Sequence, residues 1–251
     1  MPVPDIRIAP DQRAWAQDTA ALLHQLSLPI LTARPRLLLT LSGGATPRLL
    51  YQALAAPPWN KTFDWSRIWF LFGDERCIPP DHPDSNYGMA KQTLFDPLGI
   101  SSAQVHRMEG ERLNPESAAS QYESVIRNLT HCAEPALPHL DVILLGLGED
   151  GHTASLFPGT AALHDHTHVV TVGRSPHGIT SRLTMTLGVI NQANVVLFLV
   201  AGAAKAPIVR RVLEPRSEAD RRLPAACVKP DTGRVIWLLD RTAAAELTQY
   251  H

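Results

Sequence analysis

The stretch LLLTLSGGATP, residues 37–47, runs from an apolar segment directly into a pair of glycines. Leu37–Leu41 is almost entirely apolar, which is typical of a strand in a parallel sheet that is covered on each side. Gly43 and Gly44 let the backbone approach an anion with its N–H groups pointing inward. Thr46 fits the N-cap of a following helix, whose positive end would face the loop. The segment therefore predicts a strand–turn–helix unit that can hold a phosphate, and a plain tight turn is the alternative.

Further apolar runs along the chain have the same character as this first strand. They are Ile68–Phe72, Val142–Leu147, Val169–Val172, Val195–Val200 and Val235–Leu239. Amphipathic stretches between them predict helices after Asp11, from about Pro115 to Leu129, and from near Lys205. The alternation predicts an α/β fold with a mostly parallel, doubly wound, Rossmann-like sheet. Because no repeat or interdomain linker is visible, residues 1–251 are expected to form a single domain.

Composition limits the kinds of partner. The chain has 251 residues, of which 45% are hydrophobic and 19% charged, and its formal net charge is −1. Such a balance creates no field that attracts nucleic acid or a membrane surface, so local cations must hold any anionic substrate. The three cysteines match no disulfide or zinc pattern, and no signal-like start or membrane-length apolar run is present. We expect a soluble, cytoplasmic protein that is a monomer or a small homo-oligomer.

Glycines and ionisable side chains follow four of the predicted strands. These segments are Ser42–Pro47, Gly73–Arg76, Gly148–His152 and Gly202–Lys205. In an open α/β sheet, ligands bind at the carboxyl ends of the strands, so the convergence predicts a catalytic or binding site at one edge. Neighbouring side chains on a strand point in opposite directions, so at most one member of the Asp74-Glu75 doublet is expected to face that site.

Residues 146–151 spell G-x-G-x-x-G directly after a predicted strand, which is the pattern of dinucleotide-binding loops. That function needs a helix that opens at the third glycine and an acidic residue about twenty positions later. Here Pro158 and Gly159 leave room for hardly two helical turns, and the next strand ends without a carboxylate. The context therefore argues against a nucleotide cofactor. Asp150 and His152, beside these glycines, are candidates for catalysis instead.

Other catalytic templates are absent, including G-x-S-x-G, H-E-x-x-H and the P-loop. His164, His166 and His168 alternate along the chain, so they could share one face of a strand and hold a metal. No carboxylate or cysteine partner stands at a fitting spacing, and an exposed polar edge is the favoured interpretation.

Several blocks of the sequence resemble one known family. They are Leu41–Pro47, Gly73–Arg76 with Ser85-Asn86, Gly148–Gly159, Arg182–Thr186, Gly202–Lys205 and Trp237–Asp240. These blocks look like the signatures of the 6-phosphogluconolactonases, in the right order over nearly the whole chain. The resemblance implies a three-layer Rossmann-like fold with helices on both faces, no cofactor, and a role in the oxidative pentose phosphate pathway. Ala45 departs from the pattern, because the family often has Ser there.

The resemblance also implies a reaction and its residues. The substrate would be 6-phospho-D-glucono-1,5-lactone, and His152, assisted by Asp150, would take a proton from the water that attacks C1. Arg76 would stabilise the developing oxyanion, or else form a salt bridge that holds its own loop, and Asp74 is also assigned to the catalytic group. The implied substrate- and phosphate-binding residues are Ser42, Gly43, Gly44, Thr46, Gly151, Arg182 and Lys205.

Two other functions remain as alternatives. A glucosamine-6-phosphate deaminase or a related sugar-phosphate isomerase would share the fold, but family deaminases carry Glu five residues after the histidine, where this chain has Phe157. A non-catalytic domain that senses sugar phosphates would keep the glycine turn, but it would have no need for Asp150 and His152.

Overall fold

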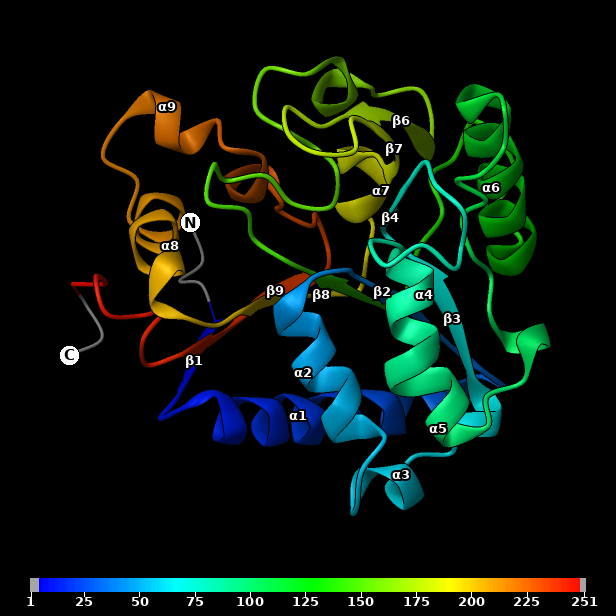
Figure 1. Ribbon diagram of the computed structural model, residues 1–251, viewed down its shortest axis with the longest axis horizontal. Helices are drawn as coiled ribbons and strands as arrows, with labels where there is room; N and C mark the ends of the chain where they lie inside the picture. Colours follow the sequence, from blue (N-terminus) through cyan, green and yellow to red (C-terminus); the bar gives the residue numbers. More distant parts are fainter. Residues whose placement is uncertain (1–4, 249–251) are drawn as a thin grey trace.

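The computed structural model describes residues 5–248, and its centre is a six-stranded sheet in which every strand pair is parallel (Figure 1). The strand order is β1-β9-β8-β5-β2-β3. The bounds are β1 (Asp5–Ala9), β2 (Leu37–Leu41), β3 (Ile68–Phe72), β5 (Val142–Leu145), β8 (Val195–Val200) and β9 (Arg234–Asp240). Helices pack around this sheet, so the predicted Rossmann-like α/β fold class is confirmed.

Helices separate most of the strands along the described chain. They are α1 (Gln12–Ala33), α2 (Ala45–Leu54), α3 (Trp59–Thr62), α4 (Asn86–Ala90), α5 (Asp96–Leu98), α6 (Pro115–Thr130), α7 (Leu187–Ile190), α8 (Ala206–Leu213) and α9 (Glu218–Arg221). The side chain of Asp11 accepts a hydrogen bond from the amide of Ala14, so the predicted N-cap of α1 is confirmed. The predicted helices after Pro115 and near Lys205 correspond to α6 and α8.

A second, three-stranded antiparallel sheet lies beside the main one, next to α6 (Figure 1). Its order is β4-β7-β6, with β4 at Asp74–Arg76, β6 at Val170–Arg174 and β7 at Ser181–Met185. The expectation that Val169–Val172 belongs to the parallel sheet was wrong, because β6 pairs with β7 instead. An apolar run predicts a buried strand but does not say which partner it will pair with.

Strand β1 was not predicted from the sequence. Its residues, DIRIA, are partly polar because the strand lies at the edge of the sheet and pairs only with β9. Among residues 5–248, no helix combines the length and the apolar character that crossing a membrane requires.

Candidate active site

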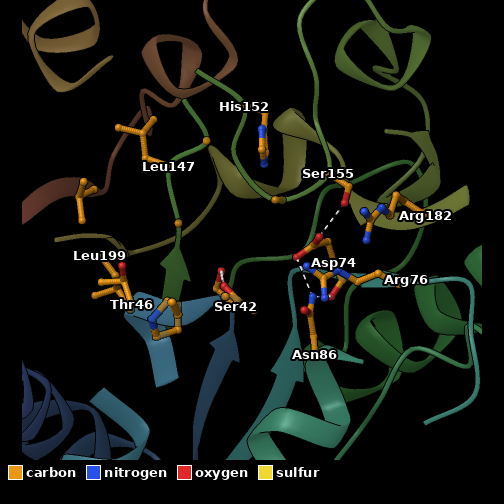
Figure 2. A pocket seen from close by; sticks show the side chains of 18 of the residues that line it. Ser42, Thr46, Asp74, Arg76, Asn86, Leu147, His152, Ser155, Arg182 and Leu199 are labelled. Atoms are coloured by element: carbon orange, nitrogen blue, oxygen red, sulfur yellow. Dashed lines mark hydrogen bonds between the residues drawn. The ribbon is translucent and has the colours of Figure 1, made fainter. Parts of the chain in front are cut away.

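A cavity of about 270 Å³ lies where the carboxyl ends of β2, β5 and β8 meet the small sheet (Figure 2). Most of the predicted site residues line it, namely Ser42, Gly43, Gly44, Thr46, Asp74, Arg76, His152, Arg182 and Lys205. Two predicted residues lie outside its lining. Asp150 contacts His152 from behind, and Gly151 has a φ of +87° and packs against Leu223. The structure thus brings together side chains from both sheets.

The turn after β2 leaves backbone donors free. Ser42 is fixed because its amide donates to the Tyr51 hydroxyl at 3.0 Å, and that hydroxyl donates to the Ser42 carbonyl at 2.8 Å. Gly44, with a φ of +106°, occupies the N-cap position of α2. Among the described residues, the amides of Gly43 and Gly44 have no hydrogen-bond partner. The turn can therefore donate to an anion.

The expected N-cap role of Thr46 was wrong. Helix α2 begins at Ala45, one position before Thr46, and no side chain caps it. Only glycine readily adopts the positive φ that the chain needs at residue 44 to enter the helix. Thr46 lies in the first turn of the helix instead, where it lines the cavity.

The turn after β8 resembles the first but is closed by a carboxylate. Gly202 has a φ of +99°, and its amide donates to both carboxylate oxygens of the buried Asp240 at 3.1 Å. Lys205 ends the short 3₁₀ turn Ala203–Lys205 that leads into α8. No ion pair of Lys205 is found within residues 5–248, and its side chain lines the cavity. This turn supplies a cation to the cavity.

The imidazole of His152 is held on several sides. Its Nδ1 lies 2.6 Å from Oδ1 of Asp150, and a Cβ at Gly148 would lie only 2.0 Å from that Nδ1. The ring of Phe157 packs against the imidazole with a centroid separation of 4.3 Å. An Nδ1–H donated to the carboxylate leaves Nε2 as the basic nitrogen, and the ring points into the cavity (Figure 2).

The surroundings of Asp150 favour the ionised form of its carboxyl group. Partial burial opposes its ionisation, but the hydrogen bonds from the side chain and the backbone of His152 outweigh that effect, so the pKa of Asp150 lies below its usual value. A carboxylate that orients an imidazole in this way stabilises the imidazolium form during proton transfer.

Asp74 lies across the cavity in an enclosed position and is 8% exposed. Its Oδ2 accepts a hydrogen bond from the hydroxyl of Ser155 at 2.6 Å, and its Oδ1 accepts one from the side-chain amide of Asn86 at 3.2 Å (Figure 2). Glu75 points the other way, and its carboxylate accepts hydrogen bonds from the backbone amides of Asn86 and Tyr87 at the start of α4. Only Asp74 of this doublet lines the cavity.

Arg76 and Arg182 are direct cross-strand partners on β4 and β7. Like charges directly opposite each other destabilise a sheet. Burial, and then the charge of Arg76, lower the pKa of Arg182 from its usual value. Buried guanidinium nitrogens of Arg182 (Nε and Nη1) and of Arg76 (Nε) have no partner among the described residues. An anion bound here would meet these unused donors and relieve the repulsion.

The alternative role considered for Arg76, a salt bridge within its own loop, is not seen among residues 5–248. Its guanidinium instead donates to the backbone carbonyl of Asp84. Neither Arg76 nor Arg182 has a carboxylate oxygen within ion-pair distance in residues 5–248.

The three histidines near residue 166 do not form the strand face that would hold a metal. His164 ends a 3₁₀ turn, β6 begins only at Val170, and the histidines are exposed. His168 pairs with Asp165. Within the described chain, no group of three or more His, Cys, Asp and Glu side chains could hold a metal ion. No helix opens at Gly151 either, so the dinucleotide pattern lacks its context.

Sequence reasoning assigned no role to several side chains in the lining. Ser155 and Asn86 lie in blocks that resembled the family, but the contacts that they make with Asp74 span 81 and 12 residues. Ala154 adopts a left-handed φ of +47°, which is uncommon for a residue other than glycine. No local pattern signals these features, because they depend on how distant loops meet.

Comparisons with known proteins agree over nearly the full length. A family model described as glucosamine-6-phosphate isomerases/6-phosphogluconolactonase matches residues 10–237. The 6-phosphogluconolactonase of Nostoc sp. is 38% identical over 244 residues, covering 97% of this chain and 98% of that protein. The one from Homo sapiens is 37% identical over 240 residues, covering 93% and 91%. A solved structure of 6-phosphogluconolactonase from Trypanosoma brucei has a TM-score of 0.83 at 28% identity, covering 98% of this chain and 99% of that one.

Proposed function

Because the chain belongs to the glucosamine-6-phosphate isomerase/6-phosphogluconolactonase family, we propose that it hydrolyses 6-phospho-D-glucono-1,5-lactone to 6-phospho-D-gluconate with His152 as general base. The resemblance seen in the sequence is confirmed, and the chain is an enzyme, a carboxylic ester hydrolase of carbohydrate metabolism. The observation that carries the mechanism is the imidazole that Asp150 orients at the edge of a cavity lined by cations.

The chemistry follows from the free nitrogen of that imidazole. Nε2 of His152 takes a proton from water while the water oxygen attacks C1 of the lactone. The tetrahedral intermediate carries a negative charge on the former carbonyl oxygen, which the guanidinium of Arg76 stabilises. When the C1–O5 bond breaks, the ring oxygen leaves as an alkoxide and receives the proton from the imidazolium. His152 is then neutral again, and the product is the open-chain acid.

The phosphate of the substrate orients the ring. The amides of the Gly43-Gly44 turn, together with Arg182 and Lys205, supply donors and positive charge at the cavity. The phosphate is remote from the reacting carbonyl, so its binding energy serves to place C1 beside His152. Ser42 and Thr46 complete this phosphate-binding group, and Gly151 shapes the loop that carries the imidazole.

The proposal is tested by measuring proton release from freshly generated lactone, with spontaneous hydrolysis subtracted. Purified protein should open the lactone far faster than buffer alone. It should release no ammonia from glucosamine 6-phosphate, which is the activity expected of the other branch of the family. Ammonia release without lactone turnover would reverse the assignment, and binding without either activity would favour a sensor.

Several properties of the whole protein are part of the same proposal. Residues 1–251 act as one domain in the cytoplasm, which is supported by the three unpaired cysteines and by a charged, phosphorylated substrate. We expect activity without added metal or cofactor, which treatment with a chelator checks. The absence of a nucleic-acid partner and the monomeric or small homo-oligomeric state remain predictions, and light scattering tests the latter.

A further inference from the structure

Asp74 is the one carboxylate in the described lining of a cavity that is otherwise rich in donors. Arg76, Arg182 and Lys205 can only donate hydrogen bonds, and the amides of the glycine turn donate as well. These donors suit the phosphate and the lactone carbonyl, both of which only accept. The ring hydroxyls of a sugar lactone are different, because each carries a hydrogen that needs an acceptor.

The carboxylate of Asp74 is fixed by two neutral donors. Ser155 and Asn86, each 2% exposed, donate to Oδ2 and Oδ1 respectively. The side-chain amide of Asn86 also donates to the backbone carbonyl of Asp74 at 2.9 Å, and this second bond sets the orientation of the amide. Since each carboxylate oxygen can accept two hydrogen bonds, both oxygens of Asp74 keep an unused acceptor site.

The arginines do not use this acceptor capacity. Arg182 lies near enough for the charge of Asp74 to favour its protonated form. However, no oxygen of Asp74 lies within ion-pair distance of Arg76 or Arg182 in residues 5–248. The cavity therefore offers a rigid, charged acceptor next to a group of unused donors.

We propose that Asp74 accepts a hydrogen bond from a ring hydroxyl of the substrate and thereby selects sugar lactones that carry that hydroxyl. Ser155 and Asn86 are positioning residues that act through Asp74. The inference rests on the proposed lactonase function and deepens it. A site that is built to bind a hydroxyl rejects an analogue that lacks it, because its buried acceptor is then left without a partner.

A purely structural role for Asp74 makes a different prediction. The bond from Ser155 ties the loop that carries His152 to strand β4, so removing Asp74 could simply displace the imidazole. All substrates would then lose activity by the same factor. Only recognition of a hydroxyl makes the loss depend on which hydroxyl the substrate carries.

The experiment measures kcat/KM for the parent lactone and for its 2-, 3- and 4-deoxy analogues. Each lactone is made in the cuvette by oxidation of the corresponding sugar phosphate. For one analogue, wild type should be slower by about 10- to 100-fold than for the parent. We call the ratio of kcat/KM for the parent to kcat/KM for the analogue the gap. In Asp74→Asn the gap for that same analogue should shrink at least about fivefold, because the charge-assisted hydrogen bond is lost.

Two further variants keep the test decisive. Ser155→Ala keeps the carboxylate of Asp74 but removes the hydrogen bond that positions its Oδ2, so the same gap should narrow by a smaller factor than in Asp74→Asn. This variant replaces Asp74→Asn in the test if Asp74→Asn does not fold. Asp150→Asn is the matched control, a carboxylate outside the lining, and it should slow parent and analogues equally. A gap that is unchanged in both Asp74→Asn and Ser155→Ala, with wild type active on the parent, overturns the inference and leaves the lactonase proposal intact. Absence of parent turnover in wild type would instead contradict the lactonase proposal.

Discussion

The candidate site contains two aspartates in opposite situations. Asp150 is open, with a side chain 42% exposed, and its partner is the imidazole of His152. Asp74 is enclosed, only 8% exposed, and its partners are the neutral donors Ser155 and Asn86. A carboxylate beside an imidazole supports proton transfer, whereas one held by two neutral donors is fixed in position. The surroundings, rather than the residue type, therefore decide the role of each carboxylate.

The two aspartates also come from different parts of the fold. Asp150 lies in the loop after β5 of the parallel sheet, and Asp74 begins β4 of the antiparallel sheet. Ser155 joins the two regions, because it lies in the loop that also carries His152 and donates to Asp74. The open region should be sensitive in chemistry and the enclosed region in binding and stability.

The largest expected effect is on the open side. His152→Ala should lower kcat by about 10²–10⁴-fold, because the proposed general base is removed. The free energy of unfolding should change little, since the imidazole is partly exposed. Steady-state kinetics and a urea titration measure the two quantities. Near wild-type kcat would remove His152 from the mechanism.

The next effect concerns the cations. Arg182→Ala or Lys205→Ala should weaken kcat/KM for the phosphorylated lactone by about 10- to 100-fold, the size of one charge-assisted hydrogen bond. The unphosphorylated lactone should be affected much less. Equal losses on both lactones would contradict the phosphate assignment. Lys205→Ala should leave stability unchanged, because its side chain has no ion pair in the described residues.

A comparison of stability separates the aspartates directly. Asp74→Ala should lower the free energy of unfolding by about 1–3 kcal/mol, because the buried hydroxyl of Ser155 loses its acceptor and the side-chain amide of Asn86 loses one of its two. Asp150→Ala should cost about 0–1 kcal/mol, as expected for an exposed pair. Urea denaturation of both variants measures this difference. Equal losses in the free energy of unfolding would show that the difference in exposure between the two aspartates does not affect stability.

A smaller effect is expected at Ala154, which has a left-handed φ of +47° and lies in the loop between His152 and Ser155. Ala154→Gly removes the strain of about 1 kcal/mol but adds comparable freedom to the unfolded chain, so stability should change by less than about 1 kcal/mol. A more flexible loop should still place His152 less well, so kcat should fall a few-fold with KM nearly constant. Unchanged kcat would mean that Ser155 alone fixes the loop.

The smallest effect is a dependence of stability on pH. The pKa of Asp150 is lower in the folded protein than in the unfolded chain, where it has its ordinary value of about 3.9. The contribution of Asp150 to the free energy of unfolding is therefore fully present above that ordinary pKa and is lost as the pH falls through the pKa of the folded state. The difference in free energy of unfolding between wild type and Asp150→Asn should therefore shrink below about pH 4. Because the pair is exposed, the change should stay within about 1 kcal/mol. A difference that grows on acidification would reverse the sign assigned here.

The sequence by itself determined the local units of this protein. Leu37–Leu41 and the glycines after it specify a buried strand and a tight turn, because backbone conformation and side-chain periodicity act over a few residues. Asp150 and His152 are two positions apart, so their pairing also belongs to one loop. The position of Phe157 in the sequence already distinguished this chain from the deaminase pattern.

Only the tertiary structure decided how these units meet. It placed β6 in a second sheet, opposed Arg76 to Arg182 across an antiparallel pair, and brought Ser155 to Asp74 over 81 residues. The physical reason is that an apolar or glycine pattern fixes the conformation of a segment, whereas strand pairing and register depend on partners elsewhere in the chain. The loop that carries Asp150 and His152 is therefore recognisable from sequence, whereas the contacts that hold Asp74 opposite it are not.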